Sequence, residues 1–184
     1  MTETVVLDLD KLNQALPRVR ASLINYIYDA AVFLLNHHRH QTGLRCEVRN
    51  LEEKLNFATL VWTRPYSESM INTFGDTDYA VEFAAEGVAC LTFRATTQYT
   101  AIKRSQRNDG VDFWLTECDD LDKFPFQFAA RMESKGITEA RYPSDIKAKV
   151  DEGISQSKRS DETRLPAYII VTDFGEPVIV KVQR

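Results

Sequence analysis

The stretch Pro-Phe-Gln-Phe-Ala-Ala-Arg-Met-Glu-Ser-Lys, residues 125–135, decides how we interpret this sequence. Its side chains alternate between two kinds, which is the pattern of a β-strand. One face carries Phe126, Phe128, Ala130 and Met132, and the other carries Gln127, Arg131, Glu133 and Lys135. A strand that buries one apolar face does not need so many charged residues on its second face. We therefore expect this second face to be either exposed to solvent or part of a functional site.

The strand expected just before this one, Gly110–Thr116, supplies a partner for Glu133. If the two strands form an antiparallel hairpin about a loop centred near Asp122–Lys123, the numbers of paired residues sum to roughly 245, so that Asp112 lies opposite Glu133. Two carboxylates that face each other across a ladder repel. A divalent cation between them removes the repulsion, because carboxylate oxygens are the ligands that magnesium prefers. Lys135 lies on the same face and can reach the same point.

The helix expected over residues 76–96 adds two more acids. Glu82 and Glu86 are four residues apart, about one helical turn, and either can point at the same cation. Considered alone, they fit the solvated face of a helix equally well. Asp112 also fits a turn residue that follows Asp109 and Gly110, and the charges of the later strand also fit a solvated sheet edge.

The order of elements from residue 76 onward is predicted to be α-β-β-β-α-β-β. After the first helix, the expected elements are strands over Tyr99–Arg104, Gly110–Thr116 and Pro125–Lys135, a helix capped by Ser144 that runs to about Lys158, and strands over Ala167–Asp173 and Val178–Gln183. Residues 1–75 are expected to form an extension of a helix plus a β-hairpin, either in the same domain as the core over 76–184 or as an arm. This extension could continue the sheet, form a homodimer face or bind a partner protein.

Composition narrows the class of protein. The chain has 184 residues, of which 43% are hydrophobic and 27% charged, so a single globular domain is expected. A net charge of -4 argues against a generic basic nucleic-acid binder, but it is compatible with an enzyme whose metal site is rich in carboxylates. The sequence contains no apolar run of about 20 residues and no basic-then-apolar leader, so no membrane association and a cytoplasmic location are expected.

Two motifs on this order of elements resemble a known family. Gly-Val-Asp-Phe-Trp-Leu (110–115) and Met-Glu-Ser-Lys-Gly (132–136) resemble the restriction-endonuclease-like nucleases that carry the PD-(D/E)XK motif, over about residues 76–173. The resemblance implies that Asp112 is the first acid, Glu133 the second acid and Lys135 the catalytic lysine. It also implies that Glu82 or Glu86 is the acid of the helix and that the cofactor is Mg²⁺ or Mn²⁺.

The sequence departs from that family at one position, because a valine precedes Asp112 where the motif has proline. Over nearly its whole length the chain is also similar to an uncharacterised bacterial protein family. That family carries the helix acid at the position of Glu82, and its lysine is often replaced. Lys135 is therefore the residue that argues for activity in this chain.

These observations predict a magnesium-dependent nuclease that hydrolyses phosphodiester bonds in DNA, and the resemblance implies a role in bacterial defence or DNA repair. Basic and polar residues near the motifs are candidates for contacts with the nucleic acid. They are Arg131, Gln127, Lys103, Arg104 and Lys147, with Arg107 and Arg159 flanking the same region. The alternative is an inactive protein of the same fold that acts as an interaction or DNA-binding subunit of a larger complex. The acidic net charge favours this alternative, whereas Lys135 argues against it.

Overall fold

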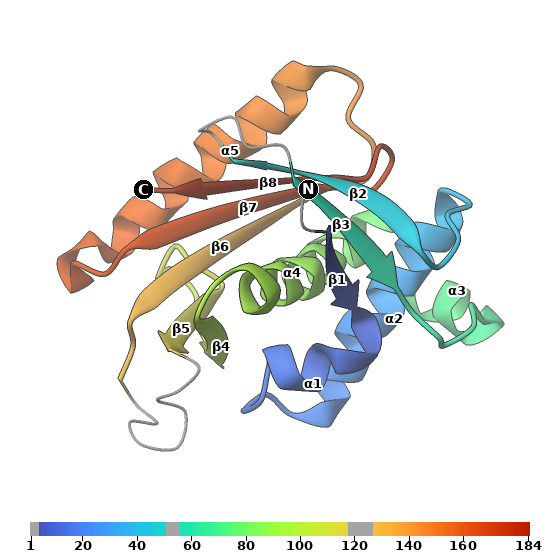
Figure 1. Ribbon diagram of the computed structural model, residues 1–184, viewed down its shortest axis with the longest axis horizontal. Helices are drawn as coiled ribbons and strands as arrows, with labels where there is room; N and C mark the ends of the chain where they lie inside the picture. The colour runs from blue at the N-terminus through green and yellow to red at the C-terminus, as the bar shows by residue number, and fades with distance from the viewer. Residues whose placement is uncertain (1–3, 51–55, 118–126) are drawn as a thin grey trace.

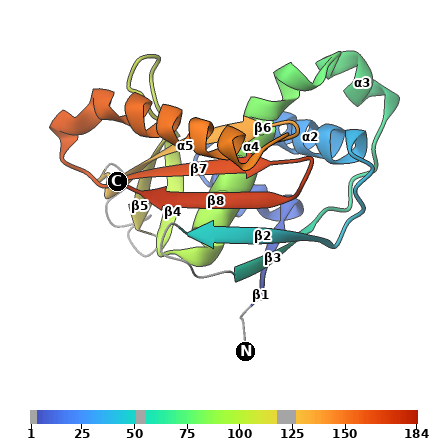
Figure 2. The same cartoon turned by 90° about the horizontal axis from the view of Figure 1, so that it is seen from above.

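A computed structural model of the chain describes residues 4–50, 56–117 and 127–184. It contains one mixed eight-stranded sheet with the strand order β1-β3-β2-β8-β7-β6-β5-β4. Helices α2 and α4 cover one face of this sheet, and α5 covers the other (Figures 1 and 2). The prediction of a mixed α/β sheet flanked by helices is therefore confirmed.

The strands are β1 (Thr4–Asp8), β2 (Leu44–Asn50), β3 (Asn56–Val61), β4 (Tyr99–Arg104), β5 (Phe113–Glu117), β6 (Ala130–Ile137), β7 (Ala167–Asp173) and β8 (Val178–Gln183). The pairs β1–β3, β2–β8 and β6–β7 are parallel, and the other neighbouring pairs are antiparallel. The helices are α1 (Leu12–Ala15), α2 (Ala21–His37), α3 (Glu68–Phe74), α4 (Thr77–Thr96) and α5 (Pro143–Ser157), with short 3-10 helices η1 (Leu9–Lys11) and η3 (Lys158–Thr163). None of the helices in the described part of the chain is long and apolar enough to cross a membrane.

Helix α4 is the central element of the larger core. Asp76 caps it, because its carboxylate accepts hydrogen bonds from the backbone N–H groups of Asp78 and Tyr79 at 3.0 and 3.3 Å. Its buried positions are mostly small residues, among them Ala80, Ala84, Ala85 and Ala89, which lets α2 and the sheet pack closely around it. The predicted helix over residues 76–96 is confirmed.

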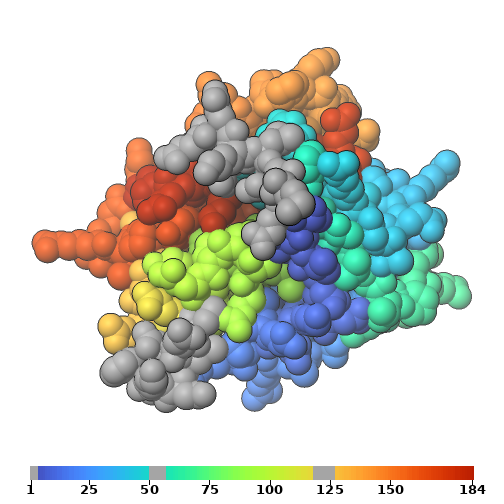
Figure 3. Space-filling view, in the orientation of Figure 1, coloured from blue at the N-terminus to red at the C-terminus, as the bar shows by residue number. Residues whose placement is uncertain are grey.

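The N-terminal 75 residues continue the sheet. β2 and β3 form the predicted hairpin, and β2 pairs in parallel with β8. β1, which no sequence pattern predicted, adds an edge strand beside β3. In the space-filling view, the yellow-green middle of the chain lies between blue N-terminal residues and red C-terminal residues (Figure 3).

Three expected boundaries differ in the structure. β5 begins at Phe113, and β6 begins at Ala130 but extends to Ile137, where the sequence pattern had indicated a strand over residues 125–135. Phe126 and the centre of the predicted hairpin loop lie outside the described residues. Helix α5 begins at Pro143 rather than after Ser144, because the Asp145 carboxylate accepts the backbone N–H groups of Arg141 and Tyr142 and so starts the helix earlier.

The close approach of α4 to β6 depends on Gly136. A Cβ atom at this position would lie 2.5 Å from the carbonyl oxygen of Val81 and 3.1 Å from the Cβ of Ala85. Only glycine lets the helix lie this close to the strand. The contact fixes the first half of α4 beside the second half of β6.

Candidate active site

A cavity of about 300 Å³ lies where β5 and β6 part, and we call it the acidic cavity. The β5–β6 ladder ends at the pair Phe113 and Met132, and beyond this pair β6 continues with β7 alone as its partner. Side chains of α4 and α5 complete the walls. The lining residues are Val81, Glu82, Glu86, Arg104, Asp112, Glu133, Ser134, Lys135, Gly136, Lys149, Glu152 and Gln156.

Asp112 lies immediately before β5, at the point where the strands part. The pairs of the ladder sum to 245, which confirms the predicted register, and Asp112 lies one residue beyond the last pair. Its backbone N–H donates to the carbonyl of Met132 at 2.8 Å. Its carboxylate accepts hydrogen bonds from the backbone N–H and the hydroxyl of Ser134, at 2.8 and 2.7 Å. The structure therefore brings Asp112 and Glu133 to the same cavity.

Glu133 is buried, with 2% of its surface exposed, and it is paired with the lysine two residues further on. The Lys135 ammonium lies 2.9 Å from a Glu133 carboxylate oxygen and 3.3 Å from one of Glu152. Burial, together with the nearby charge of Asp112, raises the pKa of Glu133 to about 7. Burial lowers the pKa of Lys135, but its hydrogen bonds and ion pairs with Glu133 and Glu152 outweigh burial and raise this pKa above its ordinary value.

The two helix acids have different environments. Glu86 is buried and accepts two hydrogen bonds from the Arg104 guanidinium, at 2.5 and 2.9 Å. Burial and the neighbouring Asp112 charge raise the pKa of Glu86 to about 8 in spite of this ion pair. Glu82 is exposed, lines the same cavity, and has no hydrogen bond or ion pair with any described residue. Glu82 is thus the helix acid that is free to bind a ligand.

The charges around the cavity do not balance. Five carboxylates line it, from Glu82, Glu86, Asp112, Glu133 and Glu152, against three cationic side chains, from Arg104, Lys135 and Lys149. Among the described residues, no three His, Cys, Asp or Glu side chains are grouped so that they could hold a metal ion together. Mg²⁺ commonly takes only one or two protein carboxylates and keeps water and substrate phosphates as its other ligands. The pair of Asp112 and Glu133 fits such an ion once Glu133, whose pKa is about 7, is ionised.

Several lining residues were not anticipated from the sequence. Ser134 occupies the middle position of the Glu-x-Lys motif, where strict alternation assigned it to the apolar face. Glu152 and Gln156 come from α5, and their spacing of four residues places them on one side of that helix, together with Lys149, which belongs to the basic residues that flank the motifs in the sequence. This spacing was visible in the sequence, but the path of α5 over the site was not.

Of the residues predicted to contact nucleic acid, only Arg104 lines the acidic cavity. Gln127, Lys103 and Lys147 lie outside it. Arg131 is 3% exposed, and its guanidinium donates to the carbonyls of Leu165 and Ser157 and to the side chains of Ser160 and Asp161. This part of the charged face of β6 is therefore covered by η3 and the end of α5. The sequence had predicted that the charged face is either exposed to solvent or part of a functional site, and at Arg131 it is neither.

No family model matches the chain, and comparisons with curated proteins and with solved structures found no match either.

Proposed function

We propose that this protein is a magnesium-dependent nuclease of restriction-endonuclease-like fold that hydrolyses phosphodiester bonds in DNA. The observation that carries the proposal is the meeting of Asp112, Glu133 and Lys135 around one cavity, with acids of α4 beside them. The order α4-β4-β5-β6-α5-β7 supports it. So do the pairings along these four strands, which are antiparallel, antiparallel and parallel, with α5 as the connection between the two parallel strands.

The proposed roles follow from the surroundings of each side chain. Asp112 and Glu133 are the metal ligands, since their carboxylates line the same cavity from the two strands that part there. Glu82 is the accessory acid, which would act through water bound to the ion and not as a third direct ligand, because it is exposed and unpaired among the described residues, whereas Glu86 is held by Arg104. When bound, Mg²⁺ or Mn²⁺ supplies Lewis-acid stabilisation of the charge on the phosphate.

The chain's own residues then position the reactants. In the hydrolysis, a water oxygen forms a bond to phosphorus, the bond from phosphorus to the leaving sugar oxygen breaks, and that oxygen takes up a proton. Lys135 has a raised pKa, so its ammonium keeps its charge at neutral pH and stabilises the charge that builds up on the phosphate oxygens. Glu133 and Glu152 hold the ammonium in place, and Ser134 holds the Asp112 carboxylate.

The proposal is tested by incubating the protein with supercoiled plasmid, linear duplex, single-stranded DNA and RNA, in Mg²⁺, Mn²⁺ or a chelator. We expect metal-dependent cutting that falls at least about 100-fold in Asp112→Asn and Lys135→Gln. Asp151→Asn is the matched control, because Asp151 is an exposed acid of α5 outside the cavity. Folded wild-type protein that cuts none of these substrates in either metal contradicts the proposal.

A second candidate is an inactive protein of this fold that acts as an interaction or DNA-binding subunit. The observation that favours it is the state of Lys135, whose side chain is only 16% exposed and is neutralised by two glutamates. The same pairing serves a purely structural role. Under this alternative, DNA binding persists while cutting is absent in every condition, and Lys135→Gln changes the melting temperature without changing any activity.

The wider role that we propose, in defence against foreign DNA or in DNA repair within the cytoplasm, rests on the resemblance of the motifs. The substrate preference in the cutting assay bears on it. Cutting of intact duplex plasmid supports defence, and cutting confined to ends or single-stranded regions supports repair.

A further inference from the structure

A second cavity of about 300 Å³ adjoins the acidic cavity, and its charge is of the opposite kind. The two cavities share Arg104, Asp112, Glu133 and Gln156. The second is otherwise lined by Arg159 of η3 and by residues 105–108, 110 and 111 of the β4–β5 turn. We call it the arginine cavity, because the only charged side chains that it adds to the shared ones are those of Arg107 and Arg159.

Neither of these arginines forms a hydrogen bond or an ion pair within the described part of the chain. Arg107 and Arg159 are both exposed. Other arginines of this region differ in this respect, since Arg104 is paired with Glu86 and Arg131 with Asp161. Two unpaired guanidinium groups that line one cavity can bind an anion together, and their planar arrangement of N–H donors suits phosphate oxygens.

The turn that carries Arg107 is held firmly in place. The backbone N–H of Ser105 donates to the carbonyl of Asp112 at 2.8 Å, and the backbone N–H of Gln106 donates to the Asp109 carboxylate at 2.9 Å. Gly110, at φ +74°, lies so close to α5 that a Cβ atom there would overlap the carbonyl oxygen of Gln156. One side of the arginine cavity is therefore formed by a fixed turn, which leads along the chain directly to Asp112.

We propose that the arginine cavity is a second phosphate subsite, in which Arg107 and Arg159 hold the phosphate that neighbours the one in the acidic cavity. The inference rests on the proposed function. It adds to that function the direction of the bound nucleic acid, whose strand passes from the acidic cavity toward the β4–β5 turn. The shared residues make the two cavities neighbours, as consecutive phosphates of one strand require. More acidic than basic side chains line the acidic cavity, and more basic than acidic side chains line the arginine cavity, which separates the place for a cation from the place for a phosphate.

The test measures binding rather than cutting, so that its failure is distinguishable from failure of the nuclease proposal. A fluorescent single-stranded oligonucleotide is titrated with protein in Ca²⁺ at several salt concentrations, using the wild type, Arg107→Gln, Arg159→Gln and the double variant. Each substitution is expected to raise Kd about tenfold, as loss of a charged hydrogen bond does. Each is also expected to reduce the slope of log K against log salt by about 0.7.

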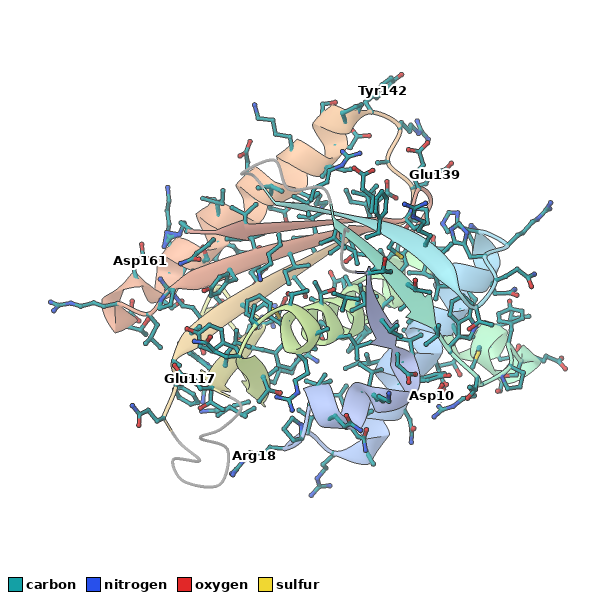
Figure 4. All side chains as sticks on the ribbon, in the orientation of Figure 1. Asp10, Arg18, Glu117, Glu139, Tyr142 and Asp161 are labelled. Atoms are coloured by element: carbon teal, nitrogen blue, oxygen red, sulfur yellow. The ribbon has the colours of Figure 1, made fainter. Side chains whose placement is uncertain are left out.

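Arg141→Gln is the matched control. Arg141 is an exposed arginine next to Tyr142, at the end of α5 opposite to the end at Asp161 and η3 (Figure 4). We expect this variant to bind like the wild type. Calorimetric titration with Mn²⁺ in the absence of DNA is expected to give the same affinity for the wild type and all arginine variants, because neither Arg107 nor Arg159 lines the acidic cavity.

The source of the phosphate is distinguished with oligonucleotides that lack or carry 5′ and 3′ phosphates. A penalty that persists without terminal phosphates supports recognition of an internal phosphodiester, and a penalty confined to one terminal phosphate supports recognition of an end. Equal Kd and equal salt slope in the wild type and the double variant overturn the subsite, whether or not the protein cuts DNA. So does a wild type that binds no oligonucleotide.

Discussion

The carboxylate of Asp112 accepts two hydrogen bonds from Ser134, one from its backbone N–H and one from its hydroxyl, at 2.8 and 2.7 Å. Asp112 precedes β5 and Ser134 lies in β6 beyond the last β5–β6 pair, so this contact replaces the ladder at the place where it ends. It fixes which way the Asp112 carboxylate faces. The middle residue of the Glu-x-Lys motif is thus a positioning residue for the first acid.

Ser134→Ala removes the hydroxyl donor and leaves the backbone donor in place. We expect the rate of cutting to fall about tenfold and the melting temperature to fall by a few degrees, because one of the two hydrogen bonds in the half-buried Asp112–Ser134 contact is lost. Cutting rates and thermal melting curves check this result. Ser155→Ala, at an exposed position of α5 outside the cavity, is the control. A rate equal to that of wild type would show that the backbone N–H alone suffices.

The stability of the metal-free protein is expected to depend on pH through Glu133. Its pKa in the folded state, about 7, lies above the ordinary value of 4.5. Below pH 4.5 the carboxyl is protonated in both states, and as pH rises toward 7 only the unfolded state ionises, so the folded state loses stability on the order of 3 kcal/mol. Glu133→Gln lacks this loss. The melting temperature of the variant relative to wild type is therefore expected to rise between pH 5 and pH 8.

Divalent cation should oppose this effect of pH. Binding to ionised carboxylates stabilises the folded state of wild type most at high pH. We expect Mn²⁺ to raise the melting temperature of wild type more at pH 8 than at pH 5, and to change that of Glu133→Gln far less. A pH-independent difference between the variant and wild type would contradict the burial of an ionisable carboxyl at this position.

Substitution of Glu82 is expected to change the affinity for Mn²⁺, whereas substitution of Glu86 is expected to change the melting temperature. Glu82→Gln should weaken Mn²⁺ binding about tenfold without moving the melting temperature, since this exposed side chain has no partner among the described residues. Glu86→Gln should instead change the melting temperature, with a difference from wild type that grows with pH, because burial raises the pKa of Glu86 to about 8. Calorimetry and thermal melting separate the two. The opposite assignment of effects would make Glu86 the metal ligand.

Arg131 is expected to matter for stability and not for binding. Arg131→Gln leaves the buried carbonyl of Ser157 and the half-buried carbonyl of Leu165 without their donors, which costs about 2–4 kcal/mol of the free energy of unfolding. Urea unfolding measures this loss. Lys147→Gln, at an exposed position of α5, should leave the free energy unchanged. If Arg131→Gln unfolds like wild type but binds oligonucleotide more weakly, Arg131 belongs to the nucleic-acid surface after all.

The sequence predicted much of this architecture because its strongest patterns are local. The expected centre of the hairpin loop predicted the register of β6 against β5, and the capping aspartate together with the apolar periodicity of α4 predicted that helix within one residue. β1 was missed because five residues beside a chain terminus carry little pattern of their own. Its place beside β3 is decided by a parallel pairing across more than 50 residues.

The candidate site was only partly predictable for a similar reason. Asp112, Glu133 and Lys135 lie on two neighbouring strands, so a hairpin register is enough to bring them together. Glu152 and Gln156 reach the cavity only because α5 crosses back over the sheet between β6 and β7. The fate of Arg131, buried by the same crossover, also depends on this tertiary packing and not on the strand that carries it.

The missing side chain of Gly136 sets how far the acids of α4 stand from those of β6. A single methyl group there would push the helix away and carry Glu82 and Glu86 with it, although the charged residues themselves would be unchanged. The signature of this arrangement is therefore Glu-x-Lys-Gly rather than Glu-x-Lys. A search for distant relatives should weight this glycine as heavily as the glutamate and the lysine. It would then separate chains that keep α4 close to β6 from chains that share only the Glu-x-Lys residues.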